Sequence, residues 1–245
     1  RAVYLPAGQH EVVFDYLPNS FVFGGFTSMV ATATLLLILV IVLWNRFYRE
    51  EEGRPAAQRV AKNSLTPMMA SFANKAVDFA FAMLMLRVLE PEGIGKYAFA
   101  IVLATTMENV TTFGLGTLLT REVAKQKALG NAYLSNTAIL RLALWFVSLP
   151  LLGLFLIVWR WLFHLGDDTI LAVALLMLAL APGHISAAIT SLFLAHERME
   201  YPAGVSILTT LLRVTIGLAA LVAGWGFVGL AGAAVVTNVI TMFVL

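Results

Sequence analysis

Long runs of apolar residues, separated by short polar stretches, divide most of this chain into segments. Seven such segments cover roughly 22–44, 65–86, 97–119, 137–159, 169–194, 204–223 and 227–245. A helix needs about 20 apolar residues to cross the ~30 Å hydrocarbon layer of a bilayer, and each segment is long enough to do so. The pattern predicts an all-α polytopic membrane protein with about seven transmembrane helices.

The first 21 residues follow a different pattern. Residues 3–5 and 11–16 read as two short strands on either side of a turn at 6–8. We therefore expect 1–21 to be a β hairpin that ends an extracytoplasmic β-rich domain. Because the chain begins with Arg rather than Met and stops inside an apolar run, we interpret it as a segment of a longer reading frame.

A polar stretch with Gly and Pro, residues 45–63, separates the first predicted span from the six that follow in 64–245. The alternate loops that include this linker hold nine Lys and Arg residues, whereas the opposite loops hold four. The positive-inside rule therefore places the linker in the cytoplasm and the hairpin outside. Aromatic residues at predicted membrane interfaces agree with these spans, namely Trp44, Tyr48, Tyr97, Trp159 and Trp161.

Composition narrows the possible functions. Hydrophobic residues make up 60% of the chain and charged residues 12%, and the net charge of +2 is too small to indicate a nucleic-acid partner. The chain has no cysteine, which excludes disulfides, thiolate metal sites and thiol catalysis. It also lacks a Gly-rich phosphate loop, an HExxH motif and a GxSxG motif, so neither a cofactor nor a catalytic residue is predicted.

Five charged residues interrupt the predicted spans: Lys75, Asp78, Glu108, Arg141 and Arg213. A charge in hydrocarbon is costly and normally faces a bundle interior or a water-filled cavity. Each of the five lies on a polar stripe at helical spacing. The stripes are Ser71, Asn74, Lys75 and Asp78; Thr105, Glu108, Asn109 and Thr112; Thr137, Arg141 and Ser148; and Ser206, Thr209, Thr210, Arg213 and Gly217. Four such helices predict a shared polar lumen.

Three cations and two carboxylates leave that predicted lumen with a net positive charge. Such a lumen suits an anionic head group such as a pyrophosphate, which Arg and Lys bind through charge-assisted hydrogen bonds. We expect Arg213→Ala in the complete protein to abolish export of such an anionic substrate while leaving membrane insertion intact. The predicted substrate-binding residues are Arg213, Lys75, Arg141 and Asn74, and the predicted coupling carboxylates are Asp78 and Glu108.

Several of these residues also have a purely structural explanation. Lys75 and Asp78 could neutralise one another as a buried pair, and Glu108 could pair with Arg141 or Arg213 to fix helix register. Arg141 lies one turn inside its span and could extend to the interface. Arg213, near the centre of its span, is the hardest to explain structurally. A carboxylate beside a cation could instead couple transport to protons.

Pro182 and Gly183 fall near the middle of the fifth span. They predict a kink or break there, either as a packing feature or as a hinge. His184, directly after them, is interpreted as a hydrogen-bonded polar group rather than a proton carrier.

Two stretches resemble a known family. LRVLEPEGIGKY at 86–97 and FGLGTLLTREVA at 113–124 resemble loop motifs of the polysaccharide-biosynthesis flippases, the oligosaccharide-lipid exporters of the multidrug/oligosaccharidyl-lipid/polysaccharide superfamily. Glu90 and Thr112 depart from the family's usual Gly and Asp. The resemblance, over about 62–245, implies the first six-helix lobe of a two-lobed transporter that works by alternating access. It also implies export of an undecaprenyl-pyrophosphate-linked oligosaccharide across the bacterial cytoplasmic membrane.

Residues 1–44 instead resemble the carboxyl end of bacterial multi-spanning proteins related to membrane glycosyltransferases. Two rival functions follow: a drug or cation exporter of the same superfamily, which would need a net acidic lumen, and the tail of a glycosyltransferase-like protein whose catalytic portion lies upstream. The resemblance of residues 62–245 to the flippases implies three kinds of partner: a lipid-linked anionic glycan, membrane lipid and other polysaccharide-assembly proteins.

Overall fold

The structure is a computed structural model. It describes residues 56–245 and, in addition, the three isolated residues Gly8, Gly24 and Ser28; between 56 and 245, side chains are described from Ser64 onward. The predicted hairpin at 1–21 and the predicted first span at 22–44 lie outside the described residues. So does the linker up to residue 55, whereas residues 56–63 of the predicted linker are already helical.

The described part of the chain is helical throughout and contains no strand. Six spans are long and apolar enough to cross a membrane, one of them built from two helices, so this part is a polytopic membrane protein. The helices are α2 (Ala56–Val88), α3 (Pro91–Thr112), α4 (Leu115–Lys125), α5 (Gly130–Phe163), α6 (Asp167–Ala195), α7 (Glu200–Val222) and α8 (Gly226–Val244), with a 3-10 turn at Lys127–Leu129.

The third predicted span, 97–119, is not one helix. It is interrupted between α3 and α4, where Phe113 and Gly114 have φ angles of 36° and 73°. Glycine adopts this left-handed conformation without steric cost, and Phe113 adopts it while its side chain is 83% exposed. The boundaries of α6, α7 and α8 follow their apolar runs closely because the length of each run matches a bilayer crossing. α2 and α5 begin nine and seven residues before their predicted segments, since the polar residues there continue the helix.

The prediction at Pro182 was a kink or a break, and α6 continues through Pro182 without a break. Proline removes one backbone donor and crowds the preceding turn. Side chains from two neighbouring helices donate to carbonyls of that turn: Trp145 Nε1 to the Met177 oxygen at 2.9 Å and Asn238 Nδ2 to the Ala179 oxygen at 2.8 Å. These donors stabilise the helix where its own ladder is weakened.

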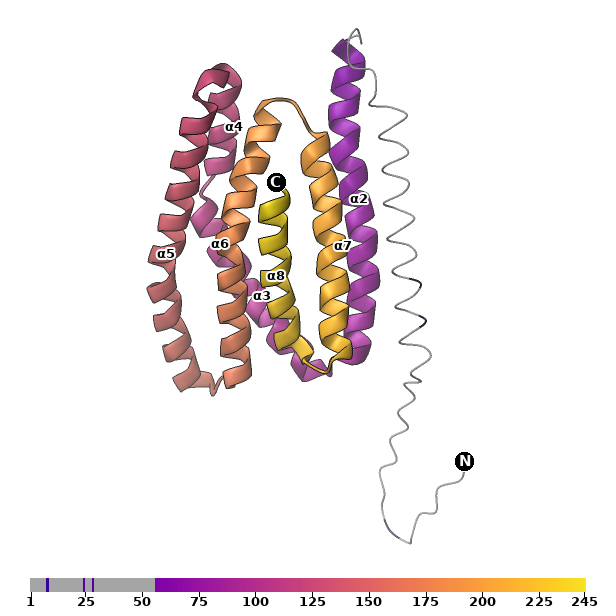
Figure 1. Ribbon diagram of the computed structural model, residues 1–245. Coiled ribbons are helices and arrows are strands. Elements are labelled where there is room, and N and C mark those ends of the chain that lie inside the picture. The colour runs from indigo at the N-terminus through magenta and orange to yellow at the C-terminus, as the bar shows by residue number, and fades with distance from the viewer. Residues whose placement is uncertain (1–7, 9–23, 25–27, 29–55) are drawn as a thin grey trace.

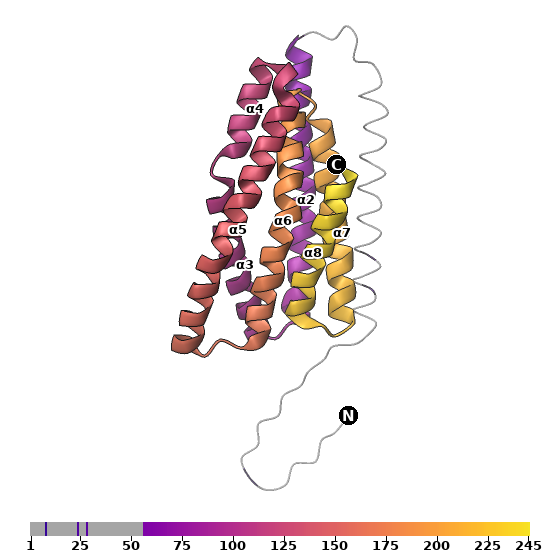
Figure 2. The same ribbon diagram turned by 60° about the vertical axis from the view of Figure 1, so that its left-hand side comes forward.

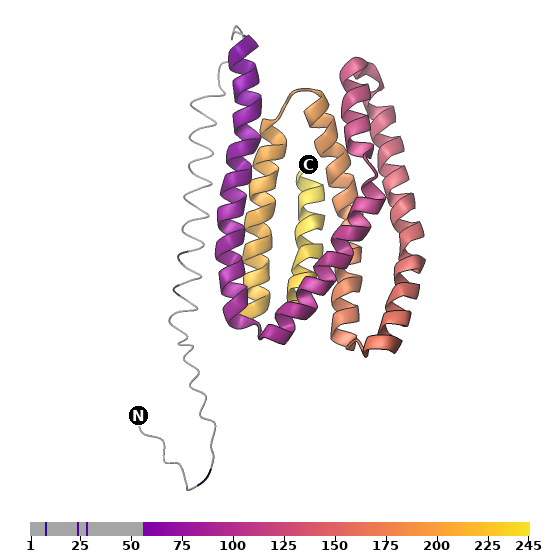
Figure 3. The ribbon, with the colours of Figure 1, turned by 180° about the vertical axis from the view of Figure 1, so that it is seen from behind.

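The helices form one lobe in which α6 and α8 are central (Figure 1). α8 packs on both α6 and α7, and α2 packs on the outer side of α7. α5 lies along the opposite side of α6 (Figure 2). Seen from behind, α3 runs obliquely from the end of α2 toward α4, which continues beside α5 and α6 (Figure 3).

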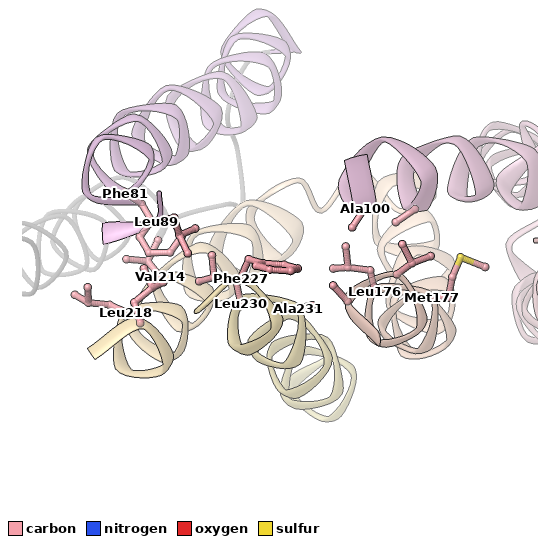
Figure 4. Packing of buried hydrophobic residues seen from close by; sticks show 14 of the residues in the cluster. Phe81, Leu89, Ala100, Leu176, Met177, Val214, Leu218, Phe227, Leu230 and Ala231 are labelled. Atoms are coloured by element: carbon pink, nitrogen blue, oxygen red, sulfur yellow. The ribbon is translucent and has the colours of Figure 1, made fainter. Parts of the chain in front are cut away.

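One apolar cluster connects these helices. Phe81 of α2 meets Val214 and Leu218 of α7, while Leu176 of α6 lies near Ala100 of α3 (Figure 4). Phe227, Leu230 and Ala231 of α8 lie between these two groups. α8 therefore joins the α2–α7 side of the lobe to the α3–α6 side.

Candidate functional site

Two predicted polar stripes meet along the seam between α2 and α7. Asn74 donates from Nδ2 to Ser206 Oγ at 2.6 Å, and the Arg213 guanidinium forms a salt bridge with the Asp78 carboxylate. Both partners of the salt bridge are partly exposed: the Arg213 side chain is 47% exposed and the Asp78 side chain 37%. We call the group Asn74, Lys75, Asp78, Ser206 and Arg213 the α2–α7 face.

Small and apolar residues hold the two helices together behind these polar pairs. Ala70 packs against Ala203 and Ile207 near one end of the seam. Toward the other end, Gly217 allows Phe81 to approach closely, because a Cβ at Gly217 would lie 3.0 Å from the tip of the Phe81 ring. The apolar contacts fix the register that brings Asp78 opposite Arg213.

Lys75 is the second exposed cation of this face, beside Arg213. Within residues 64–245, no hydrogen bond or ion pair reaches its ammonium group, and the predicted pair with Asp78 is not formed because Asp78 contacts Arg213 instead. Two cations and one carboxylate leave the α2–α7 face with one net positive charge. This arrangement offers an unpaired ammonium group beside a guanidinium that is already held in place.

Arg141 lies in a separate and buried group. Only 2% of the residue is exposed, so it does not extend to an interface. Its Nη1 donates a long hydrogen bond of 3.5 Å to the His184 carbonyl oxygen. His184 in turn shares a 3.0 Å hydrogen bond between its Nε2 and Thr111 Oγ1. We call Thr111, Gly116, Arg141, His184 and Ser191 the Arg141 cluster.

Close packing of small residues encloses Arg141. A Cβ on Gly116 of α4 would lie 2.9 Å from Arg141 Nη2 and 3.1 Å from Ser191 Oγ of α6. The guanidinium therefore occupies the space that a side chain at Gly116 would take. Its Nε has no hydrogen-bond partner among the described residues.

Glu108 is exposed on α3. Its charge acts on Arg141 over a distance, but no ion pair joins it to Arg141 or to Arg213 in the described part of the lobe. The predicted single lumen with three cations is thus not what the structure shows. Arg213, Lys75, Asn74 and Asp78 come together on the α2–α7 face, whereas Arg141 lies in its own cluster with Glu108 nearby.

Sequence reasoning did not connect two residues to these charged groups. Tyr97, assigned to a membrane interface, packs against the main apolar cluster and lies within electrostatic range of Arg213. Gly116 carries no chemistry of its own, and only its place opposite Arg141 reveals its role. No group of three or more His, Asp and Glu side chains suited to a metal ion occurs among the residues that the structure describes.

The fold and the charged face define a helical polytopic membrane protein with ionisable groups gathered on apolar spans. A sequence profile of the family described as "Polysaccharide biosynthesis protein" matches residues 60–245. The chain therefore belongs to this membrane family of polysaccharide biosynthesis and transport, which confirms the resemblance noted in the sequence. No curated protein matches the chain, and no solved structure does.

Proposed function

We propose that this chain forms one lobe of a flippase that carries a lipid-linked oligosaccharide from the cytoplasmic to the outer leaflet of the bacterial cytoplasmic membrane. The observation that carries the proposal is the net positive α2–α7 face on an otherwise apolar bundle. Ionisable groups inside a membrane protein commonly mark a path for a charged substrate. Membership of a polysaccharide-biosynthesis family supports a glycan as the cargo.

The salt bridge suggests how the face would take up an anion. Asp78 holds the Arg213 guanidinium in one orientation while the face is empty. A diphosphate brings more negative charge than one carboxylate, and Arg and Lys bind its oxygens through charge-assisted hydrogen bonds. Lys75 and Arg213 would contact the diphosphate. Asn74 would hold α2 against α7 through its hydrogen bond to Ser206. Asp78 would compete with the substrate for Arg213 and so promote its release.

Alternating access would then move the face between the two sides of the membrane as this lobe rocks against a second one. The excess of Lys and Arg in the alternate loops 45–63, 120–136 and 195–203 favours a cytoplasmic linker and an outside location for residues 1–21. A cation exporter of the same superfamily is the weaker alternative, because it would need a net acidic face. Glu108 remains a candidate coupling carboxylate, since it is exposed and unpaired within the described lobe.

Transfer between leaflets tests this function directly. The complete protein is reconstituted into vesicles with a fluorescently labelled isoprenyl diphosphate-linked monosaccharide, and transfer is followed by dithionite quenching. Arg213→Gln and Lys75→Gln should each slow transfer on the order of ten- to hundred-fold, since a hydrogen bond to a charged group contributes roughly 1.5–3 kcal/mol.

Lys125→Gln is the matched control. It removes the same charge from an exposed salt bridge with Glu122, at the far end of α4, and should leave the transfer rate unchanged. Transfer at the normal rate by Arg213→Gln and Lys75→Gln, or no transfer by the unmodified protein, would contradict the proposal.

A further inference from the structure

The first turn of α4 has free backbone donors. Its N-cap residue is Gly114, which offers no capping side chain, and the first backbone bond of the helix runs from the Leu118 N–H to the Gly114 oxygen at 3.1 Å. The N–H groups of Leu115, Gly116 and Thr117 therefore have no acceptor among the described residues. Gly114 and Thr117 are exposed, so this helix end is open to the surroundings.

A buried, permanently charged side chain lies against the same turn. Arg141 Nη2 is 2.9 Å from the position of a Cβ on Gly116, while its Nε lacks a partner. No carboxylate within the described lobe lies within ion-pair distance of Arg141. The positive end of the α4 dipole and a guanidinium that cannot lose its proton thus adjoin without an ion-paired carboxylate, since Glu108 acts on Arg141 only over a distance.

Two positive groups side by side are unfavourable when one of them is buried, as Arg141 is, unless an anion joins them. Helix N-termini with free amides bind phosphate groups for this reason. We propose that the first turn of α4 and Arg141 form a binding site for a phosphate-type oxyanion. The amides of Leu115, Gly116 and Thr117 donate to its oxygens, and Arg141 supplies the fixed charge from beneath.

The break between α3 and α4 lies inside the candidate membrane span that the two helices form together, Pro91–Lys125. α3 runs obliquely toward α4 (Figure 3), and α4 continues from the break to the charged residues Arg121, Glu122 and Lys125. An oxyanion bound at the break would therefore lie within this span rather than in the loop that follows it. Assigning the oxyanion to the transported lipid rests on the proposed function; the anion site itself does not.

Thr117→Asp is the variant that separates binding from folding. Thr117 is exposed in the first turn, so an aspartate there can accept bonds from the free amides and place its charge favourably at the helix N-terminus. The variant should be at least as thermally stable as the unmodified protein, yet its affinity for the oxyanion should fall at least ten-fold. Thr117→Asn has nearly the same shape without the charge, and it should bind within about two-fold of the unmodified protein.

Binding is measured on the complete, detergent-purified protein carrying Lys75→Gln and Arg213→Gln, which removes the cations of the α2–α7 face. The probes are inorganic pyrophosphate and farnesyl diphosphate, titrated by calorimetry. Saturable binding of both with similar affinity would support a site for free oxyanions, and much tighter binding of farnesyl diphosphate would support a lipid head group.

Binding undiminished by Thr117→Asp, or no saturable binding of either probe in the parent protein, would overturn the anion site. Either result would leave the proposed function standing if Arg213→Gln still blocks leaflet transfer. Conversely, normal transfer by Arg213→Gln together with loss of probe binding in Thr117→Asp would reject the proposed function and keep the anion site.

Discussion

Arg213 on α7 lies on an exposed edge of the lobe with a carboxylate partner, whereas Arg141 on α5 is enclosed by α4 and α6 without one. Both interrupt apolar helices, and both belong to polar stripes of similar spacing. The neighbours produce the difference. α2 brings Asp78 to Arg213, while α4 and α6 present Gly116 and Ser191, small residues that let the Arg141 guanidinium pack inside the lobe.

This difference separates two roles that the residue type alone does not distinguish. An exposed charge held by a partner is available to a substrate and contributes little to stability. A buried charge fills volume and is costly unless something compensates it. Arg213 should therefore matter mainly for transport, and Arg141 for the integrity and electrostatics of the α4 break.

The largest stability difference is expected between Arg141→Ala and Arg213→Ala. Arg141→Ala should lower the free energy of unfolding by about 2–5 kcal/mol, because it leaves a cavity where a long side chain packs. Arg213→Ala should cost no more than about 1 kcal/mol, as expected for an exposed ion pair. Unfolding in SDS–detergent mixtures measures both.

Arg141→Met is the control that separates volume from charge, since methionine refills most of the space. It should recover most of the stability lost in Arg141→Ala. Equal destabilisation by Arg141→Ala and Arg213→Ala would remove the contrast between the two regions.

A smaller loss of stability is expected when a hydrogen bond between neutral groups is removed. Asn238→Leu removes the donor to the Ala179 carbonyl near Pro182 and should cost about 0.5–1.5 kcal/mol, because this carbonyl loses one hydrogen bond while α6 stays continuous. Asn74→Leu removes an exposed bond to Ser206 and should cost less than Asn238→Leu. The same unfolding assay compares them, and a larger loss for Asn74→Leu would show that the seam is more tightly held than its exposure indicates.

The smallest effect on stability should come from Asp78→Asn. The salt bridge with Arg213 is partly exposed, so breaking it should change the free energy of unfolding by at most about 1 kcal/mol. The affinity of the α2–α7 face for pyrophosphate should rise instead, because the competing carboxylate is gone. Unchanged or weaker binding, measured by titration, would show that Asp78 positions Arg213 rather than competing for it.

The sequence predicted the spans well where apolar length decides the outcome. The segment predicted at 227–245 is the helix α8 at Gly226–Val244, and the one at 169–194 is α6 at Asp167–Ala195. The break at Phe113 and Gly114 was missed because the apolar run continues across it. Gly114 and Gly116 were the available signals, but an isolated glycine in an apolar helix does not by itself predict a break.

The pairing of the charged residues was harder to predict from the sequence than the spans. Each stripe was placed correctly on one face of its helix, but the partners depend on which helices become neighbours. Asp78 and Arg213 are 135 positions apart, and nothing local selects Arg213 over Lys75 as the partner of Asp78. The burial of Arg141 likewise depends on the small residues of α4 and α6, which carry no polar signal of their own.

Thiol labelling tests most directly whether the α2–α7 face lines an aqueous path. The chain has no cysteine, so single cysteines can be placed at Ser71 and Lys75 and, as controls on another side of the same helix, at Met69 and Ala80. All four positions are exposed in the lobe. In membranes carrying the complete protein, without other cysteines, a charged water-soluble thiol reagent should modify the cysteines at 71 and 75 rapidly and those at 69 and 80 slowly. Farnesyl diphosphate should protect the cysteine at 71. Equal labelling at all four positions, or labelling confined to 69 and 80, would contradict the account.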